Sequence, residues 1–135
     1  MSIKMNEVLK FLRENPTFYI ATEDGDQPRV RPFGAIAEFE GKLYIVTGNQ
    51  KKVYAQMIQN PKVEISVADD KGNWLRVEAT VVRDSKREAK EKMLADNDNL
   101  TGIYTLDDGI MEVFYLKDAT ATFYSFTAEP RTVTF

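Results

Sequence analysis

Apolar residues near the start of the chain follow first a helical spacing and then a strand pattern. The helical pattern runs from Met5 to Leu12 and stops at Asn15-Pro16, which predicts a first helix of about three turns with its apolar face in the core. Residues 17–22 are typical of a strand, and Asp24-Gly25-Asp26 is typical of a turn into a second strand. The chain is therefore expected to begin with a helix and a β-hairpin.

The next segment contains an interrupted strand, a complete strand and a helix. Pro32 and Gly34 interrupt the strand that starts at Arg29, and Glu40-Gly41 predicts a tight turn into a strand that ends at Thr47. A helix is then expected to begin at Gln50-Lys51-Lys52 and to close at Asn60-Pro61. Residues 63–67 and 74–81 alternate apolar and polar side chains on either side of a turn cluster at 69–73, which predicts a second hairpin.

The last third of the chain returns to strands after one short helix. Ser85 and Glu88 have the spacing of a capping box, so a helix is expected to follow, and residues 95–109 are expected to be a loop or a broken helix. Residues 111–126 contain two strand patterns joined at Lys117-Asp118. Whether a neighbouring molecule orders the tail from Glu129 to Phe135 stays open. Many short antiparallel strands with three helical pieces favour a mainly β fold, a small β-barrel with short helices.

Composition narrows the chemistry that the chain can perform. Its 135 residues are 43% hydrophobic and 11% aromatic, as in one folded domain, and they include no cysteine and no histidine. Disulfides, thiolate metal sites, a cysteine nucleophile and Ser-His-Asp catalysis are thereby excluded. The acidic clusters near Asp96 and Asp107 lack the spacing and terminal glutamate of an EF-hand, so no metal site is expected.

Charge and hydropathy indicate the cellular location of the protein and the classes of partner it lacks. With 18 basic and 21 acidic residues the net charge is −3, which does not favour binding to nucleic acid. The chain has neither the apolar run of a signal peptide nor a stretch long enough for a membrane span. We therefore expect a cytoplasmic protein without a membrane or nucleic-acid partner.

Lys51-Lys52 conflicts with its position in the first turn of the predicted helix. The backbone N–H groups there already carry a partial positive charge, which favours acidic residues. An anion docked at this end would remove the conflict, because Thr47, Asn49 and the two lysines would converge on its oxygens, and a phosphate fits well. The alternative is that both lysines point into solvent.

A second unusual feature is the segment Arg29-Val30-Arg31-Pro32-Phe33-Gly34. Alternation places both arginines on one face of a strand. Pro32 donates no ladder hydrogen bond and Gly34 has no side chain, so a flat ring could lie against this backbone. An edge strand protected by a proline explains the same pattern.

These segments together resemble a known family. The Arg-Pro strand, the strand ending in Thr47, the Lys-Lys helix start and the later strand Trp74-Leu75-Arg76-Val77-Glu78 resemble the flavin-binding split-barrel proteins, the relatives of pyridoxamine 5′-phosphate oxidase. The resemblance extends from about Met5 to Phe126 and depends on the order and spacing of the pieces. It implies that residues 1–135 form a single FMN-binding split-barrel domain.

The resemblance also implies a cofactor and its contacts. Flavin mononucleotide (FMN) would lie at the interface of a homodimer, with its phosphate held by Arg31, Lys51 and Lys52. The other positions that match cofactor contacts are Thr47 for the phosphate or ribityl chain, Pro32, Phe33, Gly34 and Val46 for the ring, Gln50 at the helix start, and Trp74, where the oxidases carry a polar flavin-contacting residue.

The resemblance does not extend to the residues with which the oxidases bind their substrate. The oxidases bind the phosphate of their vitamin substrate through a C-terminal arginine and histidine, and this chain has Arg131 but no histidine. We therefore expect a small flavin-dependent oxidoreductase that exchanges electrons with a small-molecule donor or acceptor but does not oxidise pyridoxamine phosphate. Its catalytic residues are unknown, since flavin N5 itself accepts the hydride. The alternatives are a flavin carrier, buffer or redox sensor, a barrel for a tetrapyrrole or another nucleotide, and a structural dimer.

Overall fold

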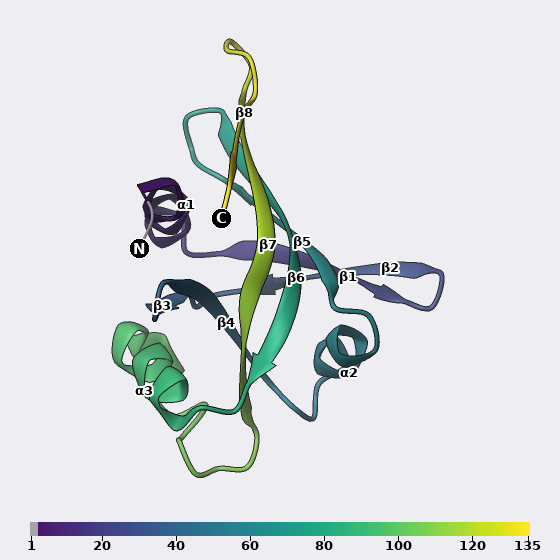
Figure 1. Cartoon of the computed structure of the whole chain (residues 1–135), viewed down its shortest axis with the longest axis vertical. Helices are drawn as coiled ribbons and strands as arrows, with labels where there is room; N and C mark the ends of the chain where they lie inside the picture. The colour runs from purple at the N-terminus through teal and green to yellow at the C-terminus, as the bar shows by residue number, and fades with distance from the viewer. Residues whose placement is uncertain (1–2) are drawn as a thin grey trace.

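The computed structural model describes residues 3–135 and arranges them around one eight-stranded antiparallel sheet (Figure 1). The strand order is β2-β1-β5-β6-β7-β4-β3, with β8 paired to β7 outside this path. The strands are β1 (Phe18–Asp24), β2 (Gln27–Phe33), β3 (Ala37–Phe39), β4 (Lys42–Gly48), β5 (Lys62–Ala68), β6 (Asn73–Asp84), β7 (Met111–Ser125) and β8 (Arg131–Thr134). The helices are α1 (Ile3–Glu14), α2 (Lys52–Gln59), α3 (Arg87–Asp96) and the short 3₁₀ turn η1 (Asp98–Leu100).

Two apolar clusters fill the space between the sheet and its helices. The larger cluster joins the inward residues of β1, β4, β5, β6 and β7 to α1 and α2, and the smaller one lies between β4, β7 and α3. In Figure 1, α1 and α3 lie to the left of β7 and α2 to its right. Strand β4 contributes Leu43 and Ile45 to one cluster and Tyr44 and Val46 to the other. Burial on both faces explains why this strand is a continuous apolar run.

The structure confirms most elements expected from the hydrophobic pattern. Helix α1 buries Met5, Val8, Leu9 and Leu12, and β1 pairs with β2 across the predicted turn. Strands β5 and β6 form the second hairpin, with Ile65 opposite Val77 in the core. Glu40 and Gly41 both adopt positive φ, 51° and 76°, as the tight turn between β3 and β4 requires. The mainly β class is therefore confirmed.

The structure corrects one expectation for the last third and answers one open question. Residues 111–125 form one strand, not two, because Lys117-Asp118 is a bulge: Asp118 has φ 52° and the register against β6 shifts between Glu78 and Thr80. A bulge bends a long strand without ending its pairing. The tail needs no neighbour, since β8 pairs with β7 of the same chain.

The predicted starts of α2 and α3 also differ from the structure. Helix α3 begins at Arg87, and its N-cap residue Lys86 makes no capping bond, so the Ser85–Glu88 capping box is not formed. Asp84 accepts the Lys86 N–H instead, at 3.0 Å. Helix α2 begins at Lys52, not at Gln50. Within residues 3–135, no helix combines the length and the apolar character needed to cross a membrane.

A buried tyrosine ties the smaller cluster to the end of β6. Tyr44 is 1% exposed, and its hydroxyl donates to Asp84 Oδ2 at 2.7 Å. Burial, followed by the bond to Asp84, raises the pKa of Tyr44, so the phenol stays protonated. Burial acts to raise the pKa of Asp84, but the bonds from Tyr44 and the Lys86 N–H outweigh it and lower that pKa overall.

We expect Tyr44→Phe to lower the free energy of unfolding by about 1.5–3 kcal/mol at neutral pH, because the ionised Asp84 loses a donor. The pKa of Asp84 is lower in the folded chain than in the unfolded one. The contribution of ionised Asp84 to the free energy of unfolding is therefore complete above its ordinary pKa of 3.8 and is lost as the pH falls through the folded value. Urea unfolding at several pH values across this range should give free energies of unfolding for the wild type and Tyr44→Phe that converge in acid. Tyr115→Phe is the control, because its ring lies 5.7 Å from that of Tyr44. Equal losses in both variants, or a loss independent of pH, would contradict the role of Asp84.

Candidate functional site

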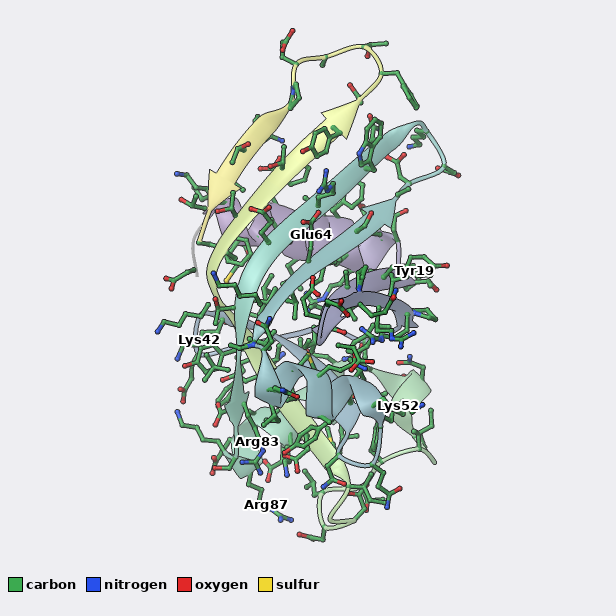
Figure 2. The ribbon with its side chains drawn as sticks, turned by 90° about the vertical axis from the view of Figure 1, so that its right-hand side faces the viewer. Tyr19, Lys42, Lys52, Glu64, Arg83 and Arg87 are labelled. Carbon is green, nitrogen blue, oxygen red and sulfur yellow. The ribbon has the colours of Figure 1, made fainter. Side chains whose placement is uncertain are left out.

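A cleft of about 400 Å³ lies between β2 and the first turn of α2, where the sequence predicted an anion. Its lining residues are Asp24, Arg29, Val30, Arg31, Lys51, Lys52, Val53 and Gln56. Figure 2 labels Lys52 at α2, on the right-hand side of the view and below Tyr19. The structure therefore brings together the three predicted phosphate ligands, Arg31, Lys51 and Lys52.

Arg31 is fixed in the cleft by neutral oxygen atoms. Its Nη1 donates to the Ile20 carbonyl at 3.2 Å and to Thr22 Oγ1 at 2.8 Å, and its Nη2 donates to Gln56 Oε1 at 2.7 Å. Thr22 also donates to Gln56 Oε1, at 2.6 Å. Thr22 and Gln56 are only 3% and 8% exposed, so the network that links β1, β2 and α2 is shielded from water.

The cleft carries a net positive charge. Arg29 is paired with Asp24 at 3.1 Å, which offsets part of its charge. Among residues 3–135, no carboxylate lies within ion-pair distance of Arg31, Lys51 or Lys52. Burial and then the nearby Arg29 lower the pKa of Arg31, which is the expected effect on a cation without a counterion. The electrostatics of the cleft therefore favour an anion over a cation.

The first turn of α2 adds to this positive potential. Its N-cap is Lys51, which has no side-chain capping bond, and the first turn has no acidic residue. The free N–H groups of a helix start favour an anion. Phosphate can therefore receive donors from two side chains of the helix, from its backbone and from Arg31.

The loop that precedes α2 is held from the opposite side by β7. Asn49 donates from its backbone to the Ile110 carbonyl at 2.9 Å and from its side chain to Glu112 at 3.2 Å. Glu112 is 7% exposed and also accepts from Arg83 Nε at 2.9 Å. The loop at residues 48–51 is thus anchored to the sheet, and the lysines start from a fixed backbone.

Sequence reasoning missed three residues that shape this site: Thr22, Gln56 and Glu112. Gln56 interrupts the apolar face of α2 between Val53 and Met57, and Glu112 interrupts an apolar strand. A polar residue at a core position is the signal that could have identified both, since buried polar groups require partners.

The comparisons with known proteins identify the family and the fold. The family model described as pyridoxamine 5′-phosphate oxidase matches residues 5–112. The chain belongs to this family. A search of curated protein sequences gave no match. The fold is the FMN-binding split barrel, as expected from the sequence.

Solved structures show the range of the fold. A NimC/NimA family protein from Clostridium acetobutylicum is 50% identical, with a TM-score of 0.90, over 96% of this chain and 93% of that one. A pyridoxamine 5′-phosphate oxidase-related, FMN binding protein from Nostoc punctiforme PCC 73102 is 12% identical, with a TM-score of 0.64, over 100% of this chain and 98% of that one. A heme binding protein from Mycobacterium smegmatis is 12% identical, with a TM-score of 0.73, over 99% of this chain and 59% of that one. At 12% identity, the last two show a shared fold.

The other predicted cofactor contacts lie on the elements around the cleft. Pro32 and Phe33 end β2, and the Gly34 carbonyl accepts a bond from Asn99 Nδ2 at 3.0 Å. Val46 and Thr47 are buried in β4, which leads into the cleft loop, and Gln50 is exposed in that loop. None of these six residues is among those that line the cleft.

Trp74 lies apart from the cleft within one chain. It pairs with Ala68 at the end of β5, whereas α2 is joined to the start of that strand, about 20 Å away at the usual strand rise. Its ring stacks on Tyr124 at 5.4 Å and packs against Phe126 at 5.1 Å. Trp74 is not among the residues that line the cleft of its own chain.

A larger hollow of about 610 Å³ lies on β1, β5, β6 and β7, and its lining includes Thr22, which accepts a bond from Arg31 of the cleft. It contains Glu64 and Glu78, but Glu64 is paired with Arg76 Nε at 2.5 Å. Glu38 accepts the Gly41 N–H, and Glu40 is paired with Lys86. These contacts favour structural roles over acid–base chemistry. Residues 3–135 contain no group of three acidic side chains placed to hold a metal ion.

Proposed function

We propose that this protein binds FMN with the phosphate in the cleft between β2 and α2, and that it is a small flavin-dependent oxidoreductase. The observation that carries the proposal is the uncompensated charge of Arg31, Lys51 and Lys52 beside the uncapped start of α2. A related structure described as an FMN binding protein supports the choice of ligand.

The residues of the chain would bind and orient the cofactor. Arg31 offers a planar pair of donors to the phosphate, and Lys51 and Lys52 offer flexible cationic ones. The backbone from Pro32 to Gly34 is the candidate surface for the ring, because it lies directly after Arg31 on β2. Bound FMN supplies hydride chemistry at N5, so the protein needs no histidine to transfer electrons.

The residue content favours flavin over haem, although one protein of this fold binds heme. Haem iron is held by histidine, cysteine, methionine or tyrosine ligands, and these 135 residues contain neither of the first two. The cationic cleft has no role in ligating iron. A non-catalytic flavin carrier, buffer or sensor would use the same site, and the electron-transfer test below separates it from the enzyme.

Arg131 is unsuited to binding the phosphate of a vitamin substrate. On β8 it forms an ion pair with Glu7 of α1, and its guanidinium lies 4.6 Å from the Phe123 ring centroid. The chain has no histidine to assist it. The positioning that pyridoxamine phosphate needs is therefore missing, and lost positioning alone removes several kcal/mol from catalysis.

We also propose that the active form is a homodimer with FMN at the interface. Trp74 and Tyr124 are half-buried, while Phe126 is 85% and Tyr19 48% exposed. Aromatic surface of this kind favours association. Two-fold symmetry would let a second chain supply the contact that Trp74 cannot make within its own chain.

Lys52→Ala tests the phosphate site. The variant should bind FMN about 1.5–3 kcal/mol more weakly, the scale of a charge-assisted hydrogen bond, and riboflavin almost unchanged. Titration of both flavins measures the difference, and Lys10→Ala, at an exposed position of α1, is the matched control. Equal losses for the two flavins would overturn the assignment.

The dimer is tested by analytical ultracentrifugation of the protein with and without FMN. We expect a dimer that binds two flavins and whose single tryptophan is quenched by the bound flavin. Trp74→Phe should keep the dimer and remove the tryptophan emission. A flavin-saturated monomer would contradict the shared site.

Stopped-flow absorbance tests the enzymatic class. A nicotinamide nucleotide or an external reductase should reduce the bound flavin, and oxygen or a small acceptor should reoxidise it, because hydride transfer needs an open face of the ring. Pyridoxamine phosphate should not be oxidised at a useful rate. A flavin that no donor reduces would favour the carrier or sensor, and efficient turnover of pyridoxamine phosphate would overturn the argument from Arg131.

A further inference from the structure

The two arginines of β2 line the same cleft but are held by different kinds of atoms. Arg29 is bound by the carboxylate of Asp24. Arg31, two residues later, is bound by a carbonyl, a hydroxyl and an amide oxygen, from Ile20, Thr22 and Gln56. A carboxylate both orients a guanidinium and cancels its charge, whereas a neutral oxygen orients it and leaves the charge available.

The bonds of Arg31 also leave part of its hydrogen-bonding capacity free. A guanidinium has five N–H donors. Three bonds to protein use both N–H groups of Nη1 and one of Nη2, so the Nε–H and one Nη2–H remain for a ligand. Two donors on a fixed plane match two oxygens of a phosphate.

Gln56 has no other evident reason to be polar. It lies on the buried face of α2 with Val53 and Met57, where an apolar residue would pack against the sheet. Burial of a polar side chain is costly unless it is hydrogen-bonded. Both bonds received by its Oε1 come from the Arg31 network, one from Arg31 and one from Thr22.

We propose that Gln56, supported by Thr22, is a positioning residue of the phosphate site that fixes the Arg31 guanidinium without neutralising it. This inference rests on the proposed binding of FMN. The preference for a phosphorylated flavin then depends on the buried, neutral side chain of Gln56, although Gln56 itself need not contact the ligand. Glutamate is nearly the same size but would pair with Arg31 and cancel its charge.

Two substitutions separate the orienting role of Gln56 from its neutrality. Gln56→Glu keeps the contact to Arg31 but neutralises the guanidinium, so the ratio of FMN to riboflavin affinity should fall about 10- to 100-fold. Gln56→Met keeps the volume and removes one of the three bonds that hold Arg31, so the ratio should fall about 3- to 10-fold through weakened positioning. Gln59→Glu adds the same charge at an exposed position of the same helix and should change the ratio by less than about twofold.

Side-chain nitrogen NMR of the flavin-free protein provides a second readout. Rotation of the Arg31 guanidinium should be slow in the wild-type protein and in Gln56→Glu, and fast in Gln56→Met. If a Gln56 variant does not fold, Thr22→Val, which removes the other side-chain acceptor of Arg31, should give the same loss of FMN preference and of restricted rotation.

The outcomes distinguish this inference from the proposed function. A wild-type protein that prefers FMN, with a preference unchanged in both Gln56 variants, would overturn the inference and leave FMN binding intact. Equal weakening of FMN and riboflavin would also overturn it, because a packing role alone predicts that result. A wild-type protein without preference for FMN would overturn both, and free rotation of Arg31 in the wild type would overturn the positioning role by itself.

Discussion

The guanidinium of Arg31 is held between three elements of the fold without a countercharge, and the rest of the cleft depends on that arrangement. Thr22 comes from β1, Arg31 from β2 and Gln56 from α2, so one hydrogen-bond network fixes the helix start against the hairpin. Partial burial of an unpaired cation is unfavourable, which the lowered pKa of Arg31 reflects. A ligand that supplies the missing charge would stabilise the folded protein, by about 2.7 kcal/mol at 100 times its dissociation constant.

The scaffold keeps this unfavourable site rigid by anchoring its surroundings on both sides. Strand β4 is buried on both faces and runs directly into the loop before α2. A Cβ at Gly48 would lie 3.2 Å from Ile110 Cγ2, so glycine allows the segment before β7 to pack against this strand end. Glu112, Arg83 and Asn49 then fasten the loop to the sheet. The lysines are therefore presented by a fixed backbone, whereas their side chains stay exposed.

Local sequence patterns were sufficient to predict much of the fold and the cations of the site. The helical spacing of α1, the two hairpins and the conflict of Lys51-Lys52 with a helix start all depend on residues close in sequence. Gln56 and Glu112 could not be assigned in this way, because Gln56 bonds Thr22 across 34 residues and Glu112 bonds Asn49 across 63. The bulge at Asp118 was misjudged as a strand end for a similar reason: only the pairing with β6 shows that the strand continues.

The choice of ligand can be measured directly by competition. The purified protein would be mixed with FMN, riboflavin and haem at equal concentration, separated from free ligand by gel filtration, and examined by visible absorption and phosphate analysis. A cleft built around Arg31 predicts a protein fraction with the flavin spectrum and one phosphate per flavin. A haem Soret band, a fraction without colour, or flavin retained without phosphate would contradict it.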